Sequence, residues 1–151
     1  MYEPSRQPVR TPRPAAGRRT RTAEPAAERG ASQPSRTDHL QAQLAGHLAA
    51  LLAVTDELRG AGPSEELDEA AREIAERVTE LSPTGAPVRI WEGSRPGAGH
   101  ARVAALHQHA HTIAGRVLVV AASRQDTATA MLACRRMDAH ALALNSPPVP
   151  A

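Results

Sequence analysis

Mostly apolar side chains recur at alternating spacings of three and four residues in four separate segments of this chain. This spacing places them on one face of an α-helix, because the helix completes a turn every 3.6 residues. The four series are Leu40, Leu44, His47, Leu51, Val54 and Leu58; Leu67, Ala71, Ile74, Val78 and Leu81; Val103, Leu106, Ala110, Ile113, Val117 and Val120; and Thr127, Ala130, Cys134, Met137, Ala141 and Leu144. We therefore predict an all-α fold, a four-helix up-down bundle.

The scarcity of aromatic residues favours helices over sheets. Aromatic side chains make up 1% of the chain and phenylalanine is absent, whereas sheets favour β-branched and aromatic residues. The alternative is a small α/β fold with strands near 88–92 and 116–122, because periodicity alone does not assign short apolar runs. In the bundle, we expect Trp91 to anchor the segment between the second and third helices on the core.

Capping residues predict where three of the helices begin. Thr37 or Asp38 is a suitable N-cap for the first helix, Ser64 for the second and Asp126 for the fourth. Several glycines and prolines interrupt the helical pattern over 82–99. The pattern therefore predicts two tight turns and one longer connection, with both tight turns at the same end of the bundle.

The charged residues of the second helix lie outside its apolar series, as Glu69, Glu76 and Arg72 do. Such residues are typical of a solvated helix face. Glu73 and Arg77 are four residues apart, so we expect an ion pair between them along this face.

The ends of the chain differ in composition from the middle. Residues 1–36 hold eight arginines, three glutamates and few large apolar side chains, so we expect a disordered basic tail. The bundle domain is expected over 37–145 and a flexible C-terminus over 146–151. The tail makes contact with nucleic acid a weaker functional hypothesis, since arginine suits phosphate.

No apolar run is long enough to cross a bilayer, and no export signal is evident, so the expected location is cytoplasmic without membrane contact. Cys134 is the only cysteine and excludes an intrachain disulfide. Its place in the fourth apolar series predicts a small core residue. No serine or cysteine has an evident neighbouring base, which predicts a protein that is not an enzyme.

Histidines cluster in the third predicted helix, at His100, His107, His109 and His111. On a helix, His107 and His111 share one side, while His109 points elsewhere. A pair four residues apart can bind a divalent transition metal if neighbouring helices supply further ligands.

Two further residues complete a candidate metal site. Counted from a shared end of the bundle, His47 and Asp138 lie at nearly the same depth as His111. The predicted metal ligands are therefore His47, His107, His111 and Asp138. The alternative interpretations are a structural cluster, in which a histidine partners Asp138, or a pH-sensitive contact.

The leading functional hypothesis is a helical interaction or regulatory module. Leu48, Leu52 and Leu118 widen the apolar faces beyond one stripe, and such excess is typical of a surface that binds a partner or a second copy. The sequence specifies neither the partner nor a cofactor.

Overall fold

A computed structural model describes residues 34–82, 85, 87, 89 and 99–146. It contains the helices α1 (Arg36–Ala61), α2 (Glu65–Leu81), α3 (His100–Ser123) and α4 (Thr127–Asn145). The described residues include no strand, so the predicted all-α four-helix bundle is confirmed. The alternative strand at 116–122 is wrong, because these residues lie within α3. The segment 88–92, except Arg89, lies outside the described residues, and so does the predicted anchor within it, Trp91.

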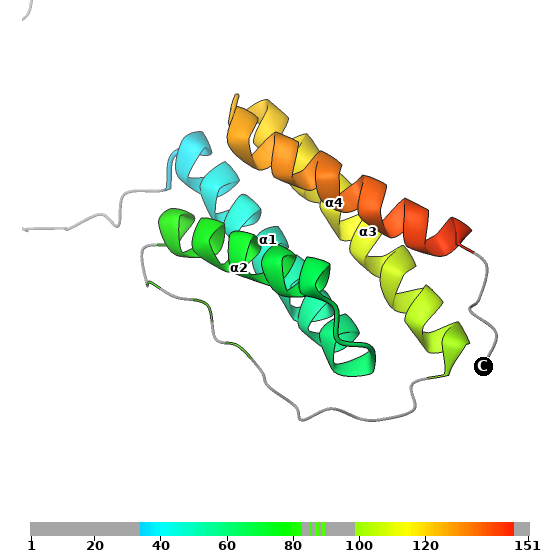
Figure 1. The fold of residues 1–151 in the computed structure, drawn as a ribbon. Helices are drawn as coiled ribbons and strands as arrows, with labels where there is room; N and C mark the ends of the chain where they lie inside the picture. Colours follow the sequence, from blue (N-terminus) through cyan, green and yellow to red (C-terminus); the bar gives the residue numbers. More distant parts are fainter. Residues whose placement is uncertain (1–33, 83–84, 86, 88, 90–98, 147–151) are drawn as a thin grey trace, which may run out of the picture. The chain divides into compact units, whose positions relative to one another are not determined.

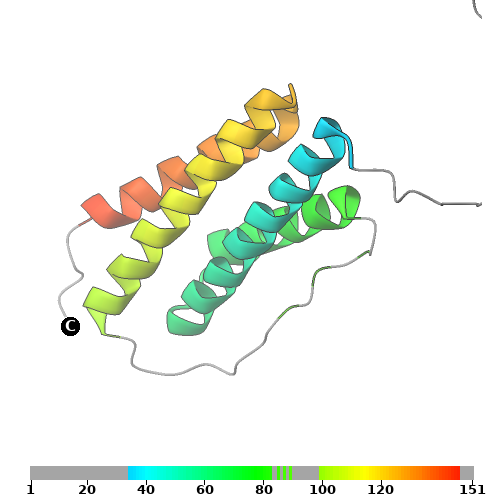
Figure 2. The ribbon, with the colours of Figure 1, turned by 180° about the vertical axis from the view of Figure 1, so that it is seen from behind.

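The helices form two hairpins that meet through α1 and α3 (Figures 1 and 2). Helix α1 packs against α2 and α3, α3 packs against α4, and α2 and α4 touch only lightly. Helices that touch run in opposite directions, whereas α2 and α3 run in the same direction.

The two tight turns lie at opposite ends of the bundle. At the end of α3, Arg124 donates a hydrogen bond to the carbonyl of Thr37, near the start of α1. The α1–α2 turn follows the other end of α1. The predicted shared end of the two turns is therefore wrong. Because α1 packs against α3 in the opposite direction, the turn of each hairpin lies beside the open end of the other hairpin.

Side-chain caps explain where α1, α2 and α4 begin, whereas α3 follows Gly99 without one. Ser64 and Asp126 cap α2 and α4 as predicted. Helix α1 begins earlier than expected, because its N-cap is Ser35. The Asp38 carboxylate accepts a hydrogen bond from the Ser35 backbone, and the Ser35 hydroxyl oxygen accepts one from the Asp38 backbone. Asp38 is thus the third helical residue of a capping box rather than the cap.

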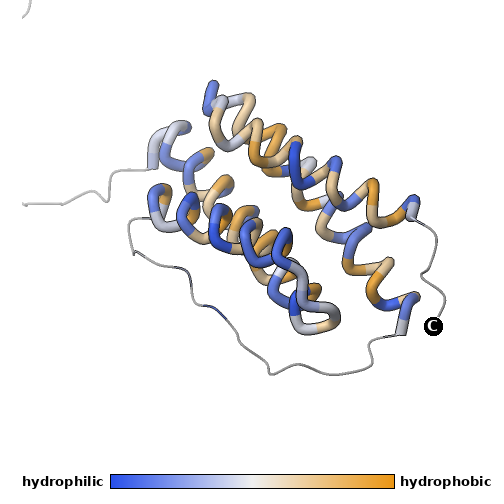
Figure 3. The backbone as a smooth tube through the Cα atoms, viewed as in Figure 1, coloured by the Kyte–Doolittle hydropathy of each residue, from blue (hydrophilic) through white to orange (hydrophobic). Residues whose placement is uncertain are grey.

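The predicted apolar faces of α1, α2 and α3 form the core. All five residues of the α2 series are buried, and the α1 series is buried at Leu44, Leu51, Val54 and Leu58. Figure 3 shows this pattern as hydrophobic colour on the inner side of α2 and hydrophilic colour on its outer side. Ala110, Ala114 and Ala121 of α3 are fully buried, and these small side chains allow close helix packing.

The predicted face of α4 is only partly right: Ala130 and Met137 pack against the core, but the buried side is centred elsewhere. Its buried residues are Thr129, Leu132, Ala133 and His140, while Cys134 is exposed. Cys134 is therefore not a core residue. Alanines of α4 lie on several of its sides, so the sides differ little in hydrophobicity. Contact with the other helices therefore determines which side is buried. That side includes two polar residues because other helices supply hydrogen-bond partners for them.

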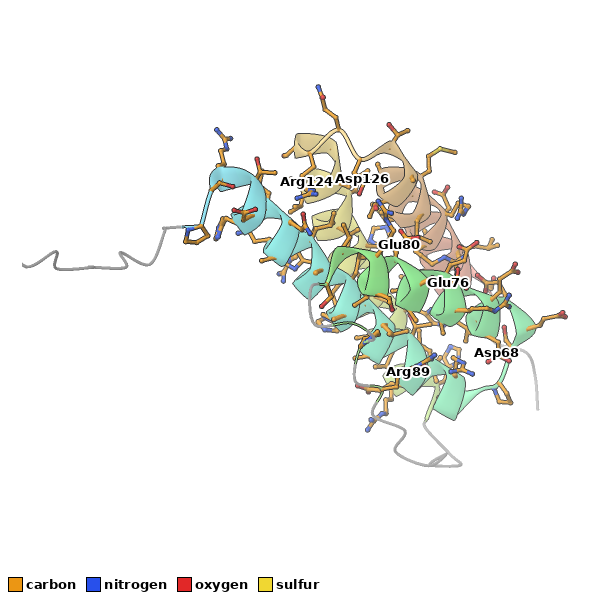
Figure 4. The ribbon with its side chains drawn as sticks, turned by 90° about the vertical axis from the view of Figure 1, so that its left-hand side faces the viewer. Asp68, Glu76, Glu80, Arg89, Arg124 and Asp126 are labelled. Carbon is orange, nitrogen blue, oxygen red and sulfur yellow. The ribbon has the colours of Figure 1, made fainter. Side chains whose placement is uncertain are left out.

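Charged side chains of α2 bridge to α4 instead of forming the expected pair. Arg77 binds Asp126 at 2.6 Å and also contacts Glu80, while Glu73 binds Arg135 at 3.0 Å. Figure 4 shows Glu80 of α2 and Asp126 at the start of α4. The predicted Glu73–Arg77 pair does not form, because both partners reach across to α4. Part of the charged α2 surface therefore holds the two hairpins together.

Candidate functional site

The most distinctive polar contact in the core joins His107 of α3 to His140 of α4. Their Nδ1 atoms lie 3.0 Å apart, and their ring centroids lie 5.3 Å apart. This centroid distance is nearly the largest that the Nδ1 separation permits, so each Nδ1 points toward the other ring. One ring must donate its Nδ1 hydrogen and the other must accept it.

Burial indicates which histidine is the donor. His140 is only 2% exposed, and its Nε2 is buried without a hydrogen-bond partner among the described residues. A buried nitrogen left without a partner is less costly as an acceptor than as an N–H donor. The arrangement therefore favours His140 donating through Nδ1, and His107 accepting at Nδ1.

The surroundings of the pair favour neutral rings. Burial, the largest cause, acts together with the positive charges of His107, Arg136 and His111 to lower the pKa of His140 to about 4. Burial also lowers the pKa of His107, although the nearby Glu66 carboxylate opposes this change. Near neutral pH, the pair therefore holds an uncharged hydrogen bond.

The four predicted metal ligands lie apart. His107 and His111 are one turn apart on the side of α3 near His140, whereas His47 lines a surface groove together with Thr112 and Arg116, on another side of α3. Asp138 is exposed on α4. Within the described ranges, no three histidine, cysteine, aspartate or glutamate side chains form a group that could hold a metal ion.

Sequence reasoning missed His140, which takes the place expected for Asp138 as the partner of His107. The cause was that the predicted α4 face was centred on Cys134, which placed His140 outside it. The wrong shared end affected only His47, because α3 and α4 do share a turn. The usable signal was that His107 and His140 lie at roughly equal distances from the tight turn between α3 and α4.

A shallow surface groove of about 370 Å³ lies between α1 and α3. Most of its lining surface is apolar, and Val119 at its edge is 66% exposed. The exposed Arg116 guanidinium makes no ion pair within the described part of the chain. The α1–α3 groove is lined by His47, Thr112, Gly115, Arg116, Val119 and Val120.

A second apolar surface runs along the outer side of α4. Its residues, which we call the α4 stripe, are Met131, Cys134, Asp138 and Leu142. Their spacing places them on one side of the helix, and Met131 and Leu142 are 58% and 70% exposed. Among the described segments, the exposed large hydrophobic residues are Val119, Met131 and Leu142. Asp138, like Arg116, has no charged partner there.

Comparisons of the chain with protein-family models, curated proteins and solved structures found no match. A search of the described helices for a membrane span found none of sufficient length and hydrophobicity. A functional argument for this protein therefore depends on its own geometry.

Proposed function

We propose that this protein is a non-enzymatic helical interaction module. Its α1–α3 groove binds an amphipathic segment of a partner protein that carries an acidic side chain. The observation that carries this proposal is the exposure of Val119 in an apolar groove. Covering a large apolar side chain with a partner removes it from water and so stabilises the complex.

Charge supports the same type of partner. Arg116 lines the groove and has no ion-pair partner among the described residues, so a carboxylate on the bound segment would complement it. The His47 ring, also in the lining, can donate or accept a hydrogen bond. The proposal places this module in the cytoplasm, as the sequence predicts.

The His107–His140 pair fits a structural role in such a module. Its shared hydrogen bond joins α3 to α4, and the unpartnered His140 Nε2 lies inside the bundle rather than on its surface. A general base must reach the proton that it removes. This inward arrangement supports our proposal that the pair stabilises the scaffold.

The dye 1-anilinonaphthalene-8-sulfonate tests the groove, because it combines an apolar body with a negative charge. We expect the wild-type protein to enhance its fluorescence and the Val119→Asp variant to lose most of this enhancement. Thr79→Asp is the matched control, since it places the same charge at an exposed site on α2, outside both apolar surfaces. Equal dye binding by wild type and Val119→Asp would refute the proposed role of the groove.

A second candidate function is a metal-responsive bundle, favoured by the two Nδ1 atoms that face each other in the His107–His140 pair. Imidazole nitrogens suit divalent transition metals such as zinc, and water molecules would complete the coordination of an ion held by these two rings. Native mass spectrometry with added Zn²⁺ should then detect one ion, removable by a chelator. The ion should be lost in His107→Ala and kept in His109→Ala. Equal binding by these two variants would exclude the pair as the site.

A further inference from the structure

We infer that the segment that fills the α1–α3 groove is the α4 stripe of a second copy of this chain. This inference rests on the proposed function of the groove and specifies its partner. Its basis is that the exposed large hydrophobic residues of the described segments belong either to the groove or to the stripe.

The two surfaces match in extent and apolar character. Met131 and Leu142 lie about 16 Å apart along α4. The groove follows α3 from Thr112 to Val120, about 12 Å. A helix laid against the groove would therefore bring most of the stripe into contact with it, covering Val119 by apolar side chains.

The unpaired charges of the two surfaces are opposite, because Arg135, which borders the stripe, is already paired with Glu73 of α2. Asp138 lies between Met131 and Leu142 in the stripe, and Arg116 lies in the groove. Neither side chain has an ion-pair partner in the described ranges. A groove-to-groove contact would bring two Arg116 side chains together, and a stripe-to-stripe contact would bring two Asp138 side chains together. Like charges disfavour both symmetric arrangements, so the groove of one copy pairs with the stripe of another.

This pairing joins two different surfaces, so it is a heterologous contact. The groove involves α1 and α3, whereas α1 makes no packing contact with α4. Each added copy therefore presents one unused groove and one unused stripe, and association continues until a ring closes. We expect the mass of the protein to rise with concentration, either to a closed ring or without a limit.

Charge reversal tests the contact. Arg116→Asp and Asp138→Arg should each weaken self-association about tenfold or more in sedimentation equilibrium. An equimolar mixture of these two variants should associate again, because each groove then faces a stripe of opposite charge. Arg72→Asp and Glu76→Arg are the matched controls on the exposed side of α2 and should associate like the wild type. Circular dichroism first establishes that each variant is folded.

The single cysteine provides a measurement of proximity. Thr112→Cys and Val120→Cys, each in a Cys134→Ser background, place a thiol one turn before or one turn after Arg116 and remove the one in the stripe. Mixed with wild-type protein and oxidised, one of the two should form a disulfide-linked heterodimer with Cys134. The direction of α4 along the groove determines which thiol Cys134 meets, because Cys134 lies one turn from Asp138. The Cys134→Ser variant alone should form none.

Three outcomes would overturn the inference: a monomer at every concentration, a mixture of the two charge variants that stays dissociated, or oxidation that links only Cys134 to Cys134. If Val119→Asp still abolishes dye binding in these cases, the groove binds a different partner and the proposed function stands. If dye binding is also unchanged, the proposed function fails together with the inference.

Discussion

The ion-paired cap at the start of α4 leads to a quantitative prediction for Asp126→Ala. Asp126 Oδ1 accepts a hydrogen bond from the Thr129 backbone at 3.1 Å, and Oδ2 accepts from the Thr129 hydroxyl and from Arg77. Loss of the cap costs about 1 kcal/mol. The buried Thr129 hydroxyl and the Arg77 guanidinium also lose an acceptor, which adds about 1–2 kcal/mol. We expect the free energy of unfolding to fall by about 2–3 kcal/mol.

Urea unfolding followed by circular dichroism measures this change. Asp126→Asn is the matched control. The side-chain oxygen of asparagine can still cap α4, while its NH₂ group cannot accept a hydrogen bond from Arg77. We expect it to cost about 1 kcal/mol less than Asp126→Ala. A loss below about 0.5 kcal/mol for Asp126→Ala would refute the reasoning, because a value that small is typical of a surface substitution. Equal losses for both variants would refute the separate contribution of the cap.

Three further predictions concern the buried histidine, a helical glycine and the tail. The pKa of His140 is lowered from 6.5 to about 4 in the folded state, so neutral His140 makes its full contribution to the free energy of unfolding above pH 6.5, and this contribution is lost as the pH falls toward 4. After allowance for solvent screening, we expect about 2 kcal/mol of loss in urea unfolding; a His140→Leu variant with the same pH dependence would contradict this. Gly115→Ala should raise the free energy of unfolding by about 1 kcal/mol, because alanine favours a helix more than glycine does and the added Cβ, 4.0 Å from Met137 Cε, makes no clash; destabilisation would contradict this. If residues 1–36 bind nucleic acid, fluorescence anisotropy should detect DNA binding that weakens steeply with salt and disappears when they are deleted; binding that survives deletion would exclude the tail.

Features that depend on neighbours along the chain were predictable. The α2 face is an example, because large aliphatic side chains alternate there with charged ones at helical spacing and leave one apolar side. The caps Ser64 and Asp126 were likewise predictable, since each binds a backbone N–H three residues away. The pairing of Glu73 and Arg77 was a local expectation that failed, because α4 offered each side chain another partner.

The candidate site depended on distant contacts and was predicted only in part. The histidine cluster identified His107 as a residue of interest, and the structure places it in the core contact with His140. His47 and Asp138 instead belong to the groove and to the α4 stripe. Their predicted meeting relied on helix order and rotation, which short-range spacing does not specify.

The amino-acid sequence specifies the number of helices, most of their boundaries and the apolar faces of the strongly amphipathic segments, because these features arise from interactions within a few turns. Only the tertiary structure decided which side of α4 is buried, which ends of the hairpins meet and which histidine faces His107. Helix α4 is rich in alanine and its sides differ little in hydrophobicity. The free energy that orients this helix therefore comes from its packing on α3 and from its bonds to Arg77 and His107, residues far away in the chain.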